Sequence, residues 1–262
     1  MKRIEKIVTI GSGNVATHLA IALKGAGKEI LQIYSRTSEN AKSLADKTGA
    51  EFTNDPMEVR DDADIYIIAV SDDALPVVAG NIDFKNNFVV HTSGSAPMDI
   101  LKVSSENYGV FYPLQTFSKT RNVDFSEIPV CIEANTFVNG ERLKNLAISL
   151  SGDVRFVDSE KRKVLHLAAV FASNFPNFMY SVAQMITEDN SLDFNILKPL
   201  ILETAMKVQD MRPTAAQTGP AIRGDEKIMK MHIEMLEKYP EFQKLYEVLS
   251  EMIGRESGKT TG

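Results

Sequence analysis

A glycine-rich segment directly after the first apolar run restricts the fold of this chain more than any other feature. It lies between an apolar stretch, 4–10, and a stretch with helical spacing, 15–26, and it reads Gly11-Ser12-Gly13-Asn14-Val15-Ala16. In such a strand, turn and helix, the first glycine permits the tight turn, the second lets a diphosphate approach the backbone, and the alanine keeps the helix close to the strand. The alternative is a turn that only links the two elements. The residues expected at a dinucleotide are Gly11, Ser12, Gly13, Asn14 and Val15.

The first half of the chain continues with alternating strand and helix patterns. A helix is expected from Thr37 or Ser38 to Gly49, and strands are expected at 29–34, 51–52, 65–70, 88–91, 109–112, 128–132 and 154–157. The run 65–70 is apolar without alternation, as expected for a strand covered on both faces. The pattern predicts an α/β fold, with a Rossmann-like, mostly parallel sheet in an N-terminal domain.

After Asp158 the pattern changes to long helical stretches. These are expected at 159–187 and 194–211, and in two segments after Gly224 that Pro240 separates. No linker or repeat divides the chain, so the first long helix is expected to leave the sheet domain directly. The sequence thus predicts a Rossmann-like dinucleotide-binding domain over 1–157 and an all-α domain for substrate binding and dimerisation over 158–262.

The segment 164–186 contains no Asp, Glu, Lys or Arg and is long enough to span a bilayer. Polar residues and a proline interrupt it, and burying each polar side chain in lipid without a hydrogen-bond partner would cost about 2–7 kcal/mol. A helix apolar around its circumference is instead expected to be covered by protein. We therefore expect no membrane association, and a homodimer built on the helical domain. The interrupting residues are His166, Ser173, Asn174, Pro176, Asn177, Ser181 and Gln184.

Composition excludes several function classes. There are 29 Lys and Arg against 35 Asp and Glu, a net charge of −6, so nothing favours a nucleic-acid partner. The single cysteine, Cys131, cannot form an internal disulfide, and no paired Cys or His pattern indicates a metal site. The N-terminus does not read as a secretory signal. The expected location is the cytoplasm.

The residues after the second predicted strand bear on the choice of cofactor. An NAD-preferring fold usually places an acidic residue there to bind the ribose 2′-hydroxyl, and this chain has none. A guanidinium can bind a 2′-phosphate with two hydrogen bonds, which a carboxylate would repel. NADP is therefore favoured, unless the arginine is merely solvated and the hydroxyls only cap a helix. The residues in question are Ser35, Arg36, Thr37 and Ser38.

Polar residues also follow the fourth and fifth predicted strands, at the sheet edge where ligands bind in open α/β folds. Val70, Ser71 and Thr92 are expected beside the nicotinamide half of the cofactor. Hydride transfer needs a proton donor for the substrate, and His91 and Ser93 are the candidates. His91 could equally be a strand-end histidine whose nitrogens are satisfied by the backbone.

Six motifs are spread over nearly the whole chain. They are Gly11 to Ala16, Ala69-Val70-Ser71-Asp72, His91-Thr92-Ser93-Gly94-Ser95, Tyr112-Pro113-Leu114-Gln115, Ser173-Asn174-Phe175-Pro176-Asn177 and Thr218-Gly219-Pro220-Ala221-Ile222-Arg223-Gly224-Asp225. Together they resemble a bacterial family of NADP oxidoreductases, whose members join a Rossmann-like domain to a helical C-terminal domain of unknown function. The chain is more distantly similar to pyrroline-5-carboxylate reductase, prephenate dehydrogenase, 6-phosphogluconate-type dehydrogenases and deazaflavin-dependent NADP reductases, which share this architecture.

The resemblance implies the architecture more strongly than the chemistry. Dehydrogenases of the 6-phosphogluconate type carry a lysine a few residues before an asparagine on the first long helix, but 164–186 holds His166 and Asn174 and no lysine. His166, Asn174 and Asn177 are expected either to face the active-site cleft or to cap the backbone gap at Pro176.

The expected function is an NADP-dependent oxidoreductase that transfers a hydride between NADP(H) and a small carbonyl, imine or hydroxyl compound. The predicted catalytic residues are His91, Ser93 and Asn174. The alternatives are a protein that senses NADP(H) without turnover and a deazaflavin-dependent NADP reductase.

Overall fold

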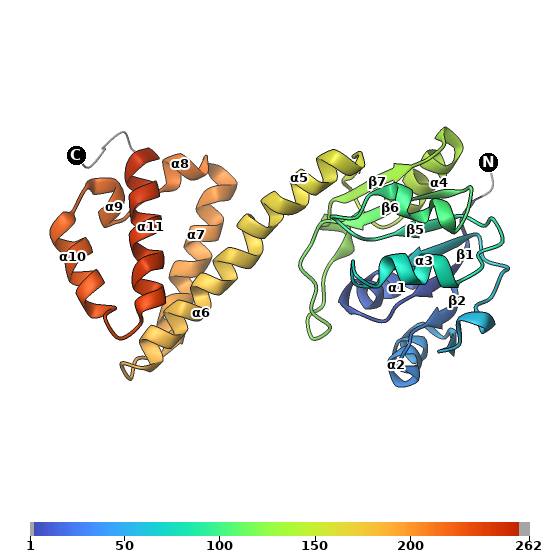
Figure 1. The fold of residues 1–262 in the computed structure, drawn as a ribbon, viewed down its shortest axis with the longest axis horizontal. Helices are drawn as coiled ribbons and strands as arrows, with labels where there is room; N and C mark the ends of the chain where they lie inside the picture. The colour runs from blue at the N-terminus through green and yellow to red at the C-terminus, as the bar shows by residue number, and fades with distance from the viewer. Residues whose placement is uncertain (1–2, 257–262) are drawn as a thin grey trace. The chain divides into compact units, whose positions relative to one another are not determined.

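The structure is a computed structural model that describes residues 3–256 of the chain. It divides into two compact units, one that ends at Asn174 and one that begins at Phe175. The first unit contains the sheet and the start of a long helix, and the second unit is entirely helical (Figure 1).

The sheet has eight strands in the order β3-β2-β1-β4-β5-β6-β7-β8, and all neighbours are parallel except β6 and β7. The order reverses between β1 and β4, which is where open α/β sheets bind ligands. The strands are β1 (Lys6–Ile10), β2 (Glu29–Tyr34), β3 (Glu51–Thr53), β4 (Ile65–Ile68), β5 (Val89–His91), β6 (Tyr108–Pro113), β7 (Val130–Ala134) and β8 (Val154–Phe156).

Helices cover both faces of this sheet. Along β4, Ile65 and Ile67 join a core with α1, α2 and α4, whereas Tyr66 and Ile68 join a second core with α3. This alternation is the period of two that a pleated strand imposes, and burial of both faces explains why the run is uniformly apolar. The helices are α1 (Asn14–Gly25), α2 (Ser38–Thr48), α3 (Leu75–Asn81) and α4 (Phe137–Ile148), with short 3-10 turns at Pro56–Glu58, Met98–Val103 and Phe125–Glu127.

One long helical stretch changes its geometry part of the way along. It consists of α5 (Ser159–Ala169), a π-helical turn (Val170–Asn174) and α6 (Phe175–Glu188). Pro176 lacks an N–H group, and its ring would collide with the carbonyl four residues earlier in a regular helix, so a wider turn before it relieves the conflict. The remaining helical elements are a 3-10 turn (Phe194–Leu197), α7 (Lys198–Asp210), α8 (Pro213–Ala216), α9 (Pro220–Arg223), α10 (Glu226–Met235) and α11 (Pro240–Glu256).

The predicted fold class is confirmed, and each predicted strand is present within a few residues of its expected bounds. The sequence pattern missed α3, because Pro76 and Gly80 interrupt its helical spacing although Pro76 stands in the first turn, where proline is tolerated. The predicted boundary after Val157 falls between β8 and α5 and stays a prediction. Within the described residues 3–256, none of the helices has the length and apolar character that a membrane crossing requires.

Candidate active site

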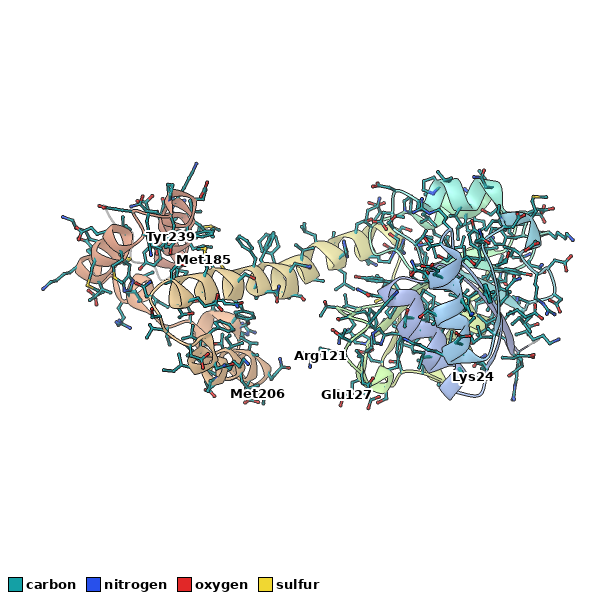
Figure 2. The ribbon with its side chains drawn as sticks, turned by 90° about the horizontal axis from the view of Figure 1, so that it is seen from below. Lys24, Arg121, Glu127, Met185, Met206 and Tyr239 are labelled. Carbon is teal, nitrogen blue, oxygen red and sulfur yellow. The ribbon has the colours of Figure 1, made fainter. Side chains whose placement is uncertain are left out.

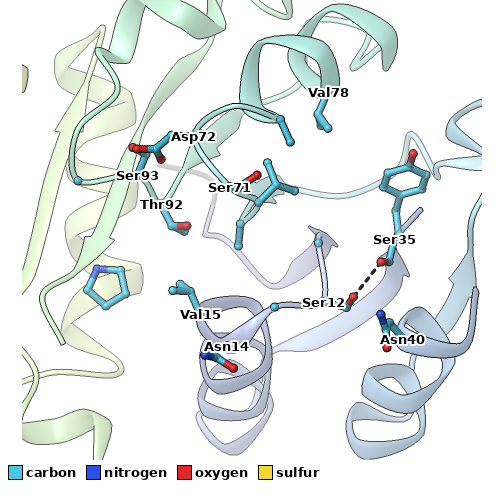
Figure 3. Close-up of a pocket in the computed structure, with 18 of the residues that line it drawn as sticks. Ser12, Asn14, Val15, Ser35, Asn40, Ser71, Asp72, Val78, Thr92 and Ser93 are labelled. Atoms are coloured by element: carbon cyan, nitrogen blue, oxygen red, sulfur yellow. Dashed lines mark hydrogen bonds between the residues drawn. The ribbon is translucent and has the colours of Figure 1, made fainter. Parts of the chain in front are cut away.

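A cavity of about 540 Å³ runs along the carboxyl ends of five neighbouring strands of the first unit (Figure 3). It reaches from the end of β2, past the turn between β1 and α1, to the ends of β4, β5 and β6. Its lining residues are Gly11, Ser12, Gly13, Asn14, Val15, Tyr34, Ser35, Arg36, Thr37, Asn40, Ala69, Val70, Ser71, Asp72, Ala74, Val78, Thr92, Ser93, Gly94, Tyr112, Pro113, Gln115 and His166.

The two glycines of the first turn have different physical roles. Gly11 has φ +117°, and a Cβ there would lie 2.2 Å from the carbonyl oxygen of Ala69, so no other residue fits without moving β4. A Cβ on Gly13 would meet nothing within 4 Å, which leaves the cavity side of this residue open. The turn therefore combines an obligatory glycine with a backbone that a ligand can approach.

The N-terminus of α1 faces this open space without a capping side chain. Gly13 is the N-cap residue, no side chain caps the helix, and its first turn contains no acidic residue. The free N–H groups and the helix dipole favour an anion here. Asn14 lies beside the opening, where its amide donates to the carbonyl of Phe117 at 2.9 Å. The turn has the properties that a diphosphate requires.

The end of β2 supplies a cation and hydroxyls to the same cavity. The Ser12 hydroxyl donates to the Ser35 hydroxyl at 2.8 Å, as Figure 3 shows. Arg36 is exposed, and among the described residues it has no hydrogen bond or ion pair. Thr37 is the N-cap of α2, but its side chain forms no capping hydrogen bond. Ser38 begins α2 and does not line the cavity, so it is the one predicted cofactor residue that the structure leaves outside.

The ends of β4 and β5 form the next part of the wall. Val70 and Ser71 follow β4, and Thr92 and Ser93 follow β5. Figure 3 labels Ser71, Thr92 and Ser93 on this part of the wall. The Ser93 hydroxyl accepts hydrogen bonds from the backbone N–H groups of Ser95 and Ala96, at 3.1 and 2.9 Å. This serine fixes the turn after β5 through the two hydrogen bonds that its oxygen accepts.

His91 lies behind the cavity wall. Its side chain has no exposed surface and is not among the lining residues, and its Nδ1 accepts a hydrogen bond from the Ser93 N–H at 3.1 Å. Burial, with the charge of Arg162, lowers the pKa of His91 to about 4, against the opposing effects of the Pro97 carbonyl and Asp72. The imidazole is therefore neutral at physiological pH. This position does not support the predicted role of His91 as proton donor.

The lowered pKa of His91 predicts a loss of stability in mild acid. His91 in the unfolded chain takes up a proton near pH 6.5, whereas in the folded chain it does so only near pH 4. Stability is therefore lost as pH falls through this window, by about 2 kcal/mol between pH 8 and pH 5. Urea unfolding at both pH values measures the free energy of unfolding. Its decrease from pH 8 to pH 5 should be about 2 kcal/mol smaller in His91→Asn than in the wild type. Equal losses in the two proteins would contradict the assignment.

Two residues that the sequence did not pair meet at the β6 end of the cavity. The hydroxyl of Tyr112 lies 3.2 Å from Nδ1 of His166, on α5, and the rings meet edge to face with centroids 6.2 Å apart. A Cβ on Gly94 would lie 2.7 Å from His166 Nδ1 and 2.9 Å from Tyr112 Cζ. Glycine at this position is what allows the turn after β5 to pack against both rings.

A second cavity, of about 500 Å³, lies beside the first, between the end of β6 and the helical stretch that begins with α5. Asn174 lines this cavity and not the first one. Among the described residues, neither Asn174 nor Asn177 uses its side chain to cap the backbone near Pro176. The two cavities share the residues Tyr112, Gln115 and His166.

The structure thus gathers eleven of the twelve predicted cofactor residues around one cavity, and of the three predicted catalytic residues only Ser93 lies there. Sequence reasoning missed the pair Tyr112 and His166 as partners. Tyr112 was noted only as part of the motif at the end of β6, and His166 only as one of three residues that could face the active-site cleft. Asn40 also lines the cavity without having been predicted, and Asp72 and Gly94 line it as members of the motifs at the ends of β4 and β5.

Two family models match the chain, one for each half. Residues 6–94 match the NADP oxidoreductase, coenzyme F420-dependent family, and residues 128–253 match a domain of unknown function, DUF2520. No curated protein sequence matches the chain.

Solved structures match it along its length. BF3122 from Bacteroides fragilis, provisionally assigned as an NADP oxidoreductase, is 46% identical, with 96% of this chain and 98% of that chain covered and a TM-score of 0.90. Protein TM1727 from Thermotoga maritima is 24% identical, with coverage of 96% and 99% and a TM-score of 0.81. An imine reductase from Myxococcus stipitatus, in complex with NADP+, is 16% identical, with coverage of 97% and 94% and a TM-score of 0.65.

The expected similarity to pyrroline-5-carboxylate reductase and prephenate dehydrogenase is confirmed at the level of the fold. The 46% identity to BF3122 extends over almost all of both chains. The protein therefore belongs to the same family as BF3122, in which a Rossmann domain of the NADP oxidoreductase type precedes a DUF2520 domain.

Proposed function

We propose that this protein is an NADP-dependent oxidoreductase that transfers a hydride between NADP(H) and a small carbonyl, imine or hydroxyl compound. The observation that carries the proposal is that one cavity joins an uncapped helix N-terminus to an exposed, unpartnered Arg36. The related fold of the imine reductase with NADP+ supports the same cofactor. When bound, the nicotinamide supplies the hydride.

Different residues along the sheet edge bind different parts of the cofactor. Backbone N–H groups at the start of α1 hold the diphosphate, and Gly13 lets it approach. Arg36, with the hydroxyls of Ser35 and Thr37, binds the 2′-phosphate at the β2 end. Val70, Ser71 and Thr92, which line the cavity at the ends of β4 and β5, would hold the nicotinamide half. The strand order supports this assignment, because the ends of β2, β1, β4 and β5 follow one another along the sheet edge.

Titration with NADPH and then with carbonyl and imine compounds tests the proposal. We expect NADPH to bind with micromolar or better affinity and to be oxidised in the presence of a substrate. Failure of NADPH to bind would contradict the proposal. Tight binding without oxidation by any compound would favour the NADP(H) sensor instead.

A deazaflavin is the second candidate for the hydride partner, because the family model that matches residues 6–94 describes a coenzyme F420-dependent oxidoreductase. Those residues form only the dinucleotide-binding part of the sheet, so the match does not extend to the second cavity. Oxidation of NADPH on addition of coenzyme F420 would select this reaction. Oxidation by an imine or carbonyl compound alone would select the first.

We also propose that two copies associate through the helical unit. Of the described residues from Phe175 onward, only Thr187 and Leu236 are buried, and large apolar side chains lie on the surface. On α7, Leu202 is 63% exposed and Met206 is 53% exposed. Met206 is labelled on this helical unit in Figure 2. A unit with so little internal core needs cover, and a second copy supplies a matching apolar face.

Sedimentation at micromolar concentration should show a dimer. Leu202→Glu should weaken association by about 1–3 kcal/mol, because a carboxylate would have to be buried in the contact. Val77→Glu is the matched control, since Val77 is 60% exposed but lies on α3 of the sheet unit, and it should leave the dimer intact. A wild-type monomer, or equal weakening by both variants, would refute the proposal.

A further inference from the structure

The second cavity has the position that a substrate site requires. It shares Tyr112, Gln115 and His166 with the cavity at the strand ends, so these residues mark the junction of the two. In a hydride transfer, the substrate carbon must lie within contact distance of the nicotinamide, at such a junction. Its other lining residues are Leu114, Thr116, Leu165, Ala168, Ala169, Val170, Ala172, Ser173 and Asn174.

The chemistry of the lining selects the class of substrate. Apart from Tyr112 and His166, the polar side chains are the uncharged Gln115, Thr116, Ser173 and Asn174, and no Lys, Arg, Asp or Glu is among the lining residues. A carboxylate taken from water into this cavity would lack the cation that normally compensates its desolvation. An uncharged molecule with an apolar body and one or two hydrogen-bonding groups fits the lining.

The π-helical turn contributes to this cavity directly. Val170, Ala172, Ser173 and Asn174 lie in the turn Val170–Asn174 and line the cavity wall. Single π-helical turns of this kind occur often at functional sites. The local widening before Pro176 therefore coincides with the place where the substrate would lie.

The contact between Tyr112 and His166 provides a proton donor at the junction. Burial raises the pKa of Tyr112, which keeps its phenol protonated. The Tyr112 hydroxyl and His166 Nδ1 are 3.2 Å apart. When Nδ1 carries the ring proton, it donates to the phenol oxygen, and the phenol proton is free to point to a substrate.

Building on the proposed function, we propose that an uncharged carbonyl or imine compound binds in the second cavity, where Tyr112 protonates it and His166 positions Tyr112. The substrate carbon receives the hydride from NADPH, and the electron pair of its double bond moves to the oxygen or nitrogen, which takes the phenol proton. The phenolate that remains is stabilised by the N–H group of His166 until it takes a proton from solvent. Tyr112 is then a catalytic residue and His166 is a positioning residue.

The substrate class is tested with two matched cyclic imines at a pH above the pKa of their ring nitrogens, where 2-methyl-1-pyrroline is neutral and 1-pyrroline-5-carboxylate is anionic. We expect NADPH to be oxidised with a kcat/KM at least about tenfold higher for the neutral imine, the equivalent of about 1.4 kcal/mol. Thr116→Arg, which adds a cation to the second cavity alone, should shift the preference towards the carboxylate. A wild-type preference for the carboxylate, or no reduction of the neutral imine, would overturn the assignment.

The roles of the two side chains are tested by separating kcat from binding. Tyr112→Phe should lower kcat by about 100-fold and leave the Kd of NADPH unchanged, as expected for loss of a general acid. His166→Leu should lower kcat similarly, and His166→Asn should restore most of it, because its amide can donate to the phenol oxygen. Thermal unfolding confirms that each variant is folded. Unchanged kcat in Tyr112→Phe, or equal kcat for His166→Leu and His166→Asn, would overturn these roles.

Direct measurement of NADPH binding distinguishes a failure of the proposed function from a failure of the proposed substrate site. If NADPH does not bind to the wild type, the proposed function fails and the inference fails with it. If NADPH binds but the neutral imine is not reduced, or Tyr112→Phe is fully active, only the inference fails.

Discussion

Replacing Arg36 with alanine should weaken NADPH binding by about 10- to 100-fold while the affinity for NADH changes by less than about twofold. The first effect corresponds to the loss of charge-assisted hydrogen bonds, about 1.5–3 kcal/mol. NADH lacks the 2′-phosphate and so loses little. Because Arg36 is exposed and has no partner among the described residues, its removal should not disturb the fold. Calorimetric titration of both cofactors measures the two affinities.

The matched control for Arg36 is Arg155→Ala. Arg155 is also an exposed arginine at the end of the sheet, but it pairs with Asp153 and does not line the cavity. The Arg155→Ala variant should bind both cofactors as the wild type does. Equal losses of affinity for NADPH and NADH in Arg36→Ala would contradict the assignment of NADP as the cofactor.

The largest expected effect on stability comes from Arg162, on α5. Its side chain has no exposed surface, and its Nη1 lies 2.5 Å from Oε2 of Glu133, on β7, whose side chain is 17% exposed. Its Nη2 donates to the carbonyl of Ala96, also at 2.5 Å, and to the hydroxyl of Ser159 at 3.2 Å. Arg162 thereby connects the start of α5 to both β7 and the turn after β5.

Arg162→Met should destabilise the protein by about 3–5 kcal/mol, because it leaves the Glu133 carboxylate nearly buried without its cation. The double variant Arg162→Met, Glu133→Leu removes both charges and should recover most of this loss. Urea unfolding measures each difference. A single variant as stable as the wild type, or a double variant less stable than the single one, would contradict this account of the pair.

Local spacing was sufficient to predict the cofactor half of the site. The turn from Gly11 to Gly13 needs only a strand before it and a helix after it, and Arg36 stands at a fixed distance from that turn along the chain. Adjacent strands of a parallel sheet also end at the same edge. The ends of β4 and β5 could therefore be placed beside the cofactor without knowledge of their side-chain contacts.

The catalytic half depends on contacts between distant parts of the chain. Tyr112 and His166 are separated by 54 positions and meet because a buried arginine fixes the start of α5 against the sheet. Spacing along the sequence alone does not predict which residue of α5 contacts Tyr112. The sequence left two roles open for His91, because position along a strand does not show whether a side chain faces the cavity or the core. It ends β5 on the buried side.

The crystal structure of the protein with NADP+ bound is the most direct test of the central claim. We expect the diphosphate within hydrogen-bond distance of the backbone N–H groups at the start of α1 and the 2′-phosphate on the Arg36 guanidinium. The nicotinamide should lie at the junction with the second cavity, near Tyr112. A cofactor bound elsewhere, or a 2′-phosphate with no contact to Arg36, would contradict the account.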